Sequence, residues 1–392
     1  MRLVARRALT ALAIFLGTAF ADAAALNSNP ACSMDKMERD PSSVIAPCSA
    51  LLNENDVSPE QRAQALFVRG SAYHRTGRPD IAAPDYDEAL KLDRNNDEIY
   101  IARANAALLL DQHDFAEAVV RVALKINPKN PRALRSMGRL YMLLDDHDEA
   151  VRYFSEALKI DPAEPYALLH RSQIFADHQQ FDQAFNDADA LVAIAPDVIN
   201  RQGFIDPQSR IRDFHVIALK NRARLYEQTS RYDLARRDLD AAVNYKAVPE
   251  ALVARGEFLW KQRGQDEEAL KDLEAATALD PNDSRTHDLR GMVLMRLRRP
   301  ELALRAFGQA IRHEPDDAYA LRMRARAHRE LGQTEEAVRD FEAAMMIDPA
   351  IARETIPALL KAGYWTSREP PKSLTPEFRD AIRACMLDTT CN

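Results

Sequence analysis

The sequence predicts an all-α protein made of stacked helical hairpins, and three observations lead to this prediction. Apolar residues recur at spacings of three and four, which places them on one face of a helix. Prolines and polar turn residues end each apolar run. The whole pattern then repeats along the 392-residue chain, which has 11 glycines and is 46% hydrophobic. A repeat of this kind predicts an array rather than a globular domain.

The segment 131–164 shows one repeat most clearly. Leu134 and Gly138 lie on one face of a first expected helix, and Ala150 and Phe154 lie on one face of a second. An acidic turn separates the two helices, and Pro162 stops the second because proline cannot continue a helix. This segment is therefore expected to form one helical hairpin of 34 residues.

Eight such units follow one another, four in residues 63–198 and four in residues 216–351, with a spacer at 199–215. Most carry small residues at positions eight and twenty, an aromatic residue or leucine at position 24 and proline at position 32. These positions resemble the tetratricopeptide repeat (TPR) family. The resemblance implies a right-handed solenoid of about eight hairpins, in which no hairpin can bury its apolar face alone. Residues 24–62 and 352–392 are expected to cap its two ends.

An arginine occupies position seven in seven of the eight units, and five of these units carry aspartate sixteen residues later, with one inserted residue allowed for. The third unit lacks both and has Met137 and Tyr153 instead. This joint replacement predicts an ion pair between the two helices of a hairpin, because apolar residues can substitute for a buried pair. These arginines are therefore expected to be structural.

Residues 1–23 have the pattern of a secretory signal. Arg2, Arg6 and Arg7 precede an apolar run, and small residues suited to cleavage follow it. The alternative is an uncleaved membrane anchor, although the apolar run is short for a membrane span. We expect export, to the periplasm or beyond the cell, and the layout resembles that of exported bacterial TPR proteins.

Four cysteines lie near the ends of the chain, at Cys32, Cys48, Cys385 and Cys391. Four cysteines allow three pairings, of which we favour the two local ones, because each would staple an end of the array. A redox pair or a metal site is the alternative, but the sequence has no C-x-x-C motif.

The sequence carries no catalytic, phosphate-binding or metal-binding motif. We therefore expect a protein that is not an enzyme and that needs no cofactor or metal. A net charge of −7 and a pI of about 5.8 argue against nucleic-acid binding.

In the family, the first helix of each hairpin lines a concave groove, and the resemblance assigns groove positions to this chain. They form two expected sets: Arg132, Arg135, Arg139, Met142, Leu143, Tyr166 and Leu169, then Arg285, Arg296, Tyr319, Arg322, Arg326 and Arg329. Arginines beside apolar residues would suit an amphipathic protein or peptide that carries acidic residues. The alternative is that the apolar residues are core and the arginines pair with neighbouring carboxylates.

The expected function is a non-catalytic protein- or peptide-binding scaffold. Within residues 352–392, the segments LLKAGYWT and LTPEFRDAIRAC resemble small peptidoglycan-binding modules. A cell-wall-associated protein whose C-terminal segment contacts peptidoglycan is therefore the alternative. The sequence assigns no oligomeric state, and membrane association would require the signal to stay uncleaved.

Overall fold

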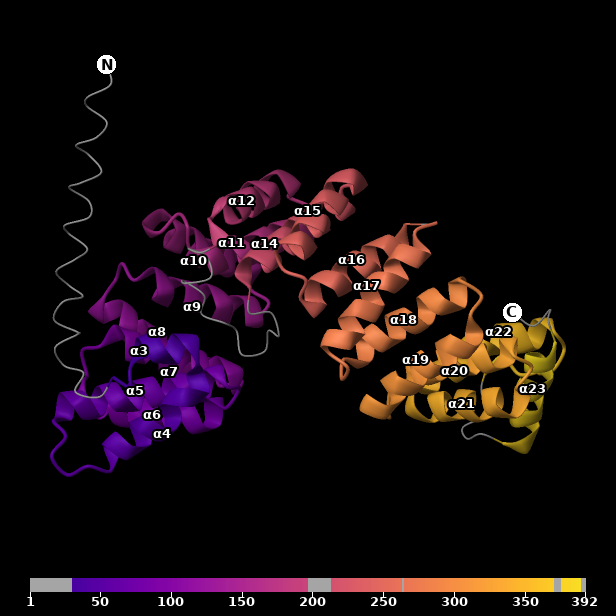
Figure 1. Cartoon of the computed structure of the whole chain (residues 1–392), viewed down its shortest axis with the longest axis horizontal. Coiled ribbons are helices and arrows are strands. Elements are labelled where there is room, and N and C mark those ends of the chain that lie inside the picture. Colours follow the sequence, from indigo (N-terminus) through magenta and orange to yellow (C-terminus); the bar gives the residue numbers. More distant parts are fainter. Residues whose placement is uncertain (1–29, 197–212, 263, 370–374, 389–392) are drawn as a thin grey trace, which may run out of the picture. The chain divides into compact units, whose positions relative to one another are not determined.

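A computed structural model describes residues 30–196, 213–262, 264–369 and 375–388, and the regular elements in these ranges are α-helices (Figure 1). In residues 41–193 and again in residues 232–387, each helix packs against the next, so that hairpins stack in sequence order. The expected all-helical array of hairpins with helices at both ends is confirmed.

The chain divides into two compact units, Met1–Leu225 and Tyr226–Asn392. The first unit contains α3 (Met34–Arg39), α4 (Pro41–Leu52), α5 (Pro59–Arg75), α6 (Pro79–Leu92), α7 (Asp97–Leu109), α8 (His113–Ile126), α9 (Pro131–Leu143), α10 (His147–Ile160), α11 (Pro165–Asp177), α12 (Phe181–Ala193) and most of α14 (Phe214–Gln228). The second contains α15 (Tyr232–Tyr245), α16 (Pro249–Lys261), α17 (Asp266–Leu279), α18 (Ser284–Arg296), α19 (Pro300–His313), α20 (Ala318–Glu330), α21 (Thr334–Ile347), α22 (Pro349–Lys361) and α23 (Pro376–Leu387). We number the hairpins from α5–α6, so that α9–α10 is hairpin 3 and α18–α19 is hairpin 7.

The small residue at position eight lets the two helices of a hairpin approach closely. In hairpin 3 a Cβ atom added to Gly138 would lie 2.5 Å from the ring of Phe154, and in hairpin 7 one added to Gly291 would lie 2.5 Å from Phe307. Atoms cannot approach so closely, so glycine is required for the ring to pack there.

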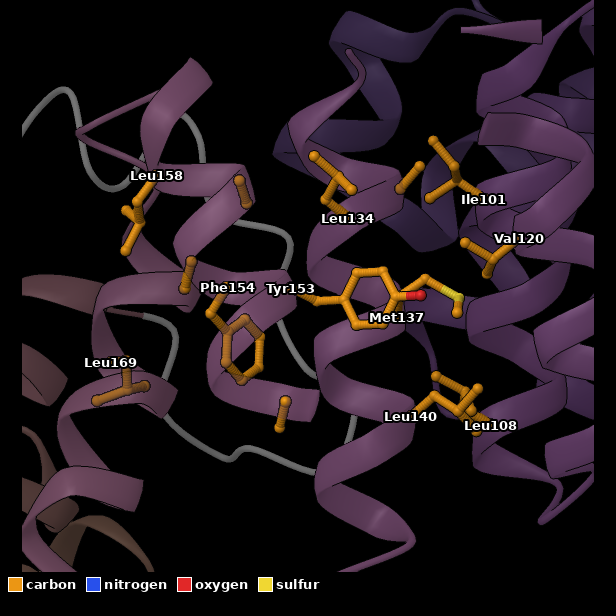
Figure 2. Close-up of a cluster of buried hydrophobic side chains, with 14 of the residues drawn as sticks. Ile101, Leu108, Val120, Leu134, Met137, Leu140, Tyr153, Phe154, Leu158 and Leu169 are labelled. Atoms are coloured by element: carbon orange, nitrogen blue, oxygen red, sulfur yellow. The ribbon is translucent and has the colours of Figure 1, made fainter. Parts of the chain in front are cut away.

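The main core of the first unit runs through several successive hairpins (Figure 2). Ile101 and Leu108 of α7, Met137 and Leu140 of α9, and Phe154 of α10 are all buried in one cluster. Because each hairpin covers the apolar face of its neighbour, the stability of the unit depends on stacking.

The turn inside each hairpin contains one residue with a left-handed backbone. Only some of these residues are glycine, such as Gly77 and Gly332; others include Asp145 and Arg298, with φ angles of 61° and 58°. The non-glycine residues adopt this strained conformation because the packing of the two helices fixes the turn.

Four of the five expected arginine–aspartate pairs are present. Arg171 donates to the two oxygens of Asp187 at 2.8 and 2.7 Å, and it also reaches Ser155 of the preceding hairpin at 2.8 Å. The same pairing joins Arg69 to Asp85, Arg255 to Asp272 and Arg324 to Asp340. These guanidinium groups therefore connect the two helices of one hairpin, and several also contact the preceding hairpin.

Other hairpins depart from this pattern. Arg103 pairs with Asp87 of the preceding hairpin at 2.8 Å. In hairpin 3, Met137 is buried and the ring of Tyr153 stacks on Tyr141 with centroids 5.5 Å apart. Apolar packing thus replaces the ion pair there, as the sequence pattern predicts.

The two ends of the array carry extra helices. At the N-terminal end, the residues expected to form a cap (24–62) contain α4 and the short helix α3 before it. At the other end, Thr375 caps α23 by accepting a hydrogen bond from the backbone N–H of Phe378, as expected for threonine followed by proline. Ile356, Leu359 and Phe378 are buried there in one cluster with Met345 of α21.

Two expectations fall partly outside the described residues. Most of the spacer 199–215 lies there; its last residues, from Asp213, are described, and Phe214 begins α14. Phe214 is buried, and its ring packs edge-on against the ring of Tyr166, with the two ring centroids 4.7 Å apart. Residues 1–23, the expected signal, also lie outside the described part.

Candidate functional site

A cavity of about 390 Å³ opens on the first-helix face of the first unit. The helices α5, α7 and α9 and the start of α11 contribute to its lining, and α3 forms a further wall. The lining residues are Met34, Met37, Glu38, Phe67, Ser71, Arg75, Glu98, Ile101, Ala102, Pro131, Arg132, Arg135, Asp161, Glu164 and Pro165. We call this cavity the N-terminal cleft.

Helix α3 is held against the array by covalent and apolar contacts. The disulfide between Cys32 and Cys48 ties its N-terminal end to α4, with Cα atoms 4.9 Å apart. Met37 is buried in a cluster with Val44 and Val68. A helix of six residues is unstable by itself, so these contacts keep the wall in place.

Arg75 joins the C-terminal end of α5 to α3. Its guanidinium donates to the backbone carbonyl of Glu38 at 3.4 Å and lies 3.8 Å from the sulfur of Met37. Burial lowers the pKa of Arg75, and the carboxylate of Glu38 opposes this shift. Even a lowered arginine pKa leaves the side chain charged at neutral pH.

Two further arginines of the cleft form ion pairs across adjacent hairpins. Arg132 pairs with Glu98, and the buried Arg135 pairs with Glu164, each at 2.7 Å. Glu164 also caps α11 by accepting from the backbone N–H of Ala167. The cleft is therefore lined by apolar side chains and by two ion pairs, of which Arg135–Glu164 is buried.

The expected groove residues of the first unit have different surroundings. Arg132 and Arg135 line the cleft. Arg139, Met142 and Tyr166 are half-buried, whereas Leu143 is exposed. Leu169 lies in the hydrophobic core.

In the second unit, the expected groove arginines lie beside carboxylates. Arg285 donates to Glu257 at 3.0 Å and Arg322 to Glu354 at 2.7 Å. Arg296 pairs with Asp266 and packs on the ring of Trp260. The guanidinium of Arg326 lies 4.0 Å from the carboxylate of Glu330. Arg329 is half-buried, and Tyr319 is exposed. Several of these arginines thus pair with neighbouring carboxylates, as the alternative interpretation of the sequence expected.

Sequence reasoning missed the wall contributed by α3. Met34 and Met37 are spaced three residues apart after Ser33, whose side chain accepts a hydrogen bond from Lys36 and caps the helix. This short helical signal could have been found. Phe67 and Ser71 occupy groove positions of hairpin 1 and were also not assigned to a site.

One of the two expected disulfides is present, between Cys32 and Cys48. Cys391 lies outside the described residues, so its pairing with Cys385 stays a prediction. In the described ranges, no group of three or more His, Cys, Asp or Glu side chains is placed to hold a metal ion. None of the described helices is long and apolar enough to cross a membrane.

Two curated proteins resemble parts of the chain. The DnaJ homolog subfamily C member 7 homolog of Schizosaccharomyces pombe is 34% identical over 102 residues, which cover 25% of this chain and 21% of the relative. The Hsp70-Hsp90 organizing protein of Triticum aestivum is 25% identical over 178 residues, which cover 36% of this chain and 31% of the relative. The chain thus matches between a fifth and a third of the length of these relatives.

Solved structures share the fold at low sequence identity. Yeast Tom70 has a TM-score of 0.53 at 18% identity, with 80% of this chain and 70% of that chain covered. The Cut9-Hcn1 hetero-tetramer of the APC/C has a TM-score of 0.50 at 16% identity, with 80% of this chain and 57% of that chain covered.

Two family models described as tetratricopeptide repeat match the sequence. One matches residues 51–97, 67–131, 220–284 and 289–352, and the other matches residues 131–164. Proteins built from these repeats typically mediate protein–protein interactions and are generally non-catalytic. The matched segments cover more than half of the sequence, and the chain belongs to the tetratricopeptide repeat family.

Proposed function

We propose that this protein is a non-catalytic scaffold that binds a protein or peptide in the N-terminal cleft. The observation that carries the proposal is a largely apolar cavity of about 390 Å³ on the first-helix face, lined by three successive hairpins, the start of α11 and α3. A concave, largely apolar site with a few polar groups is the usual form of a binding site.

The chemistry of the cleft favours an amphipathic partner. Met34, Met37, Phe67 and Ile101 offer a slot for one large apolar side chain, and methionine adapts its shape to different occupants. The side chain of Arg132 is 43% exposed although it pairs with Glu98. Its remaining N–H groups can therefore donate to a carboxylate of the partner, which supports a partner that carries acidic residues.

Export to the periplasm or beyond the cell is part of the proposal. The N-terminal signal pattern supports it, as does the Cys32–Cys48 disulfide, because disulfides persist in oxidising compartments.

Site-specific photocrosslinking tests the cleft. Benzoylphenylalanine replaces Phe67, which lines the cleft, or Phe115, which lies 43% exposed on the second helix α8. Both changes substitute one aromatic residue for another. We expect crosslinked partners at position 67 and a much lower yield at position 115 in cells that express the full chain.

Equal crosslinking at the two positions would contradict a site in the cleft. Arg132→Glu in the Phe67-substituted protein should also lower the yield, because it reverses the charge offered to an acidic partner. Arg121→Glu is the matched control, since Arg121 is exposed on α8 and pairs with Glu117 within that helix.

The peptidoglycan-binding alternative has less support. Ile356, Leu359 and Phe378 of α22 and α23 are buried in one cluster with residues of α21, which is the arrangement of a cap. A pull-down on purified sacculi tests this alternative, and retention that requires residues 352–392 would favour it.

A further inference from the structure

Hairpin 7 has a histidine in place of a core leucine. Position four of the repeat is a buried leucine in six of the other seven hairpins, namely Leu66, Leu134, Leu168, Leu219, Leu252 and Leu321. His287 takes this position in α18 and is equally buried, with 5% of its surface exposed. A polar ring that fills a leucine position is removed from water, so its nitrogens depend on the neighbouring groups.

A second histidine replaces an apolar residue in the second helix of the same hairpin. Position 30 is apolar or tyrosine in every other hairpin, with the inserted residue of hairpin 6 allowed for. In hairpin 7 it is His313, the last residue of α19. The rings of His287 and His313 stack, with centroids 6.0 Å apart and planes inclined by 10°. The two replacements therefore occur together and face each other.

The hydrogen bonding of His287 suits its neutral form. One ring nitrogen, Nε2, lies 2.9 Å from the backbone carbonyl oxygen of Pro281 and therefore donates to it. The other, Nδ1, is buried and has no hydrogen-bond partner among the described residues. A neutral imidazole satisfies this arrangement, because its Nδ1 carries a lone pair. A protonated ring would place a second N–H group where the described residues offer no acceptor.

The groups that act on His287 mostly oppose a charge on it. Burial lowers the pKa of His287, and the charges of Arg290 and His313 lower it further. The carbonyl of Pro281 and the carboxylate of Asp283 act in the opposite direction. Asp283 already caps α18, so its carboxylate is fixed at the backbone of the first turn.

The carboxylates of the segments that pack on α18 also accept hydrogen bonds of their own. Asp280, at the end of α17, accepts from the backbone of its own turn. Glu314, which follows α19, accepts from Ser284, and Asp317 caps α20. An imidazolium at His287 would therefore be buried with one donor unmatched.

We propose that His287 and His313 form an acid-sensitive switch, which holds hairpin 7 closed at neutral pH and opens it when His287 takes up a proton. In the closed form, His287 holds the connection between hairpins 6 and 7 through Pro281 and packs the first turn of α18 against the end of α19. In the open form, this turn separates from α19, so that the imidazolium reaches water. The switch lies in the second unit and does not depend on the N-terminal cleft.

The direction of the pH dependence follows from where the proton binds. In the open form, His287 binds a proton with the ordinary pKa of histidine, about 6.5, whereas the closed form binds it only at lower pH. Closure is therefore fully stabilised above about pH 6.5 and weakens as the pH falls below this value. At pH 5.5 an exposed imidazole is charged about ten times more often than neutral, so the population of the open form rises by up to about tenfold.

Hydrogen exchange of the full chain at pH 7.5 and pH 5.5 tests the proposal. Dividing by the intrinsic exchange rate at each pH removes the direct effect of pH on the exchange chemistry. We expect the protection of amides in the N-terminal half of α18 to fall by up to about tenfold at the lower pH. His287→Leu, which restores the residue of six other hairpins, should remove this loss and raise the Tm at pH 5.5.

A second variant and a control localise the switch. His313→Ile, which restores the residue of hairpins 2, 3, 4 and 8, should reduce the acid effect without removing it, because His287 stays buried. His328→Gln is the control, since His328 is the remaining histidine of the second unit and lies beside Asp340. It should leave the loss in α18 unchanged. Circular dichroism at pH 7.5 checks that each variant is folded.

Equal protection of α18 at the two pH values in the wild type would overturn the proposal. The same holds if the folded His287→Leu variant loses as much protection as the wild type. That result would assign the effect to another group of the unit, such as Asp288, whose pKa is raised by burial to about 8. Loss of the effect in His328→Gln would assign the switch to His328 and would also overturn the proposal. Crosslinking at Phe67 probes the first unit, so its outcome is independent of these results.

Discussion

At the scale of single residues, the position-seven arginines show how a charge can serve packing rather than recognition. Arg171 is 20% exposed and Asp187 is 7% exposed at their side chains, so the pair is largely removed from water. Removing one partner leaves the other charge buried and uncompensated, whereas replacing both by apolar residues need not destabilise the protein.

We therefore predict that Asp187→Ala lowers the free energy of unfolding by about 2–4 kcal/mol, because Arg171 loses its buried partner. The double variant Arg171→Met, Asp187→Tyr, which copies Met137 and Tyr153 of hairpin 3, should recover most of this loss. The new tyrosine can stack on Phe175, which holds the position of Tyr141. Urea denaturation measures both effects.

If the double variant is as unstable as Asp187→Ala, the packing of hairpin 3 does not transfer and the interpretation is wrong. Asp182→Ala is the control, since Asp182 is exposed in the first turn of the same helix.

These pairs could be read from the sequence because the repeat aligns equivalent positions, and hairpin 3 loses both partners together. Glu164 could not be recognised as a cleft residue in this way. Its position depends on the ion pair with Arg135, and only the packing of α11 on hairpin 3 brings these two residues together.

At the scale of elements, α3 is the helix least able to form by itself. It has six residues and depends on the Cys32–Cys48 disulfide and on the burial of Met37. The repeat pattern could not reveal it, because α3 lies outside the period and has no equivalent in other hairpins. The hairpin helices, in contrast, could be located to within a few residues because eight copies support each boundary.

We predict that the double variant Cys32→Ser, Cys48→Ser releases α3 from the array. A crosslink over this sequence separation of 16 contributes about 3 kcal/mol, chiefly by restricting the unfolded chain. Hydrogen exchange should show loss of amide protection in α3 and little change in α7 to α11. Crosslinking from position 67 should also decrease, because the cleft loses one wall.

A reducing agent should reproduce this loss in the wild type and leave the double variant unchanged in α3. Retained protection in the double variant would show that apolar contacts alone hold the wall.

At the scale of the whole molecule, each unit is an array whose end must be covered. In the second unit, α22 and α23 bury Ile356, Leu359 and Phe378 against Met345 of α21. Terminal repeats of such arrays need a cap with a polar outer face. The fold class was predictable because stacking follows directly from repetition, and the cap was predictable because the apolar pattern continues past the last repeat.

Deletion of residues 352–392 should therefore expose this apolar surface and destabilise the second unit. We expect faster amide exchange in α20 and α21, with exchange in α5 to α9 unchanged as the internal reference. Equal acceleration in both regions would contradict stabilisation that passes only between neighbouring hairpins.

The absence of the arginine–aspartate pair from hairpin 3 has a mechanical consequence. Directional hydrogen bonds from one guanidinium to several helices resist bending, whereas apolar side chains such as Met137 and Tyr153 slide past one another at little cost. The first unit should therefore be most compliant at hairpin 3, which supplies Arg132 and Arg135 to the cleft. A bulky partner can then widen the cleft by elastic bending, while hairpins 1 and 4, which carry the pair, keep their shape.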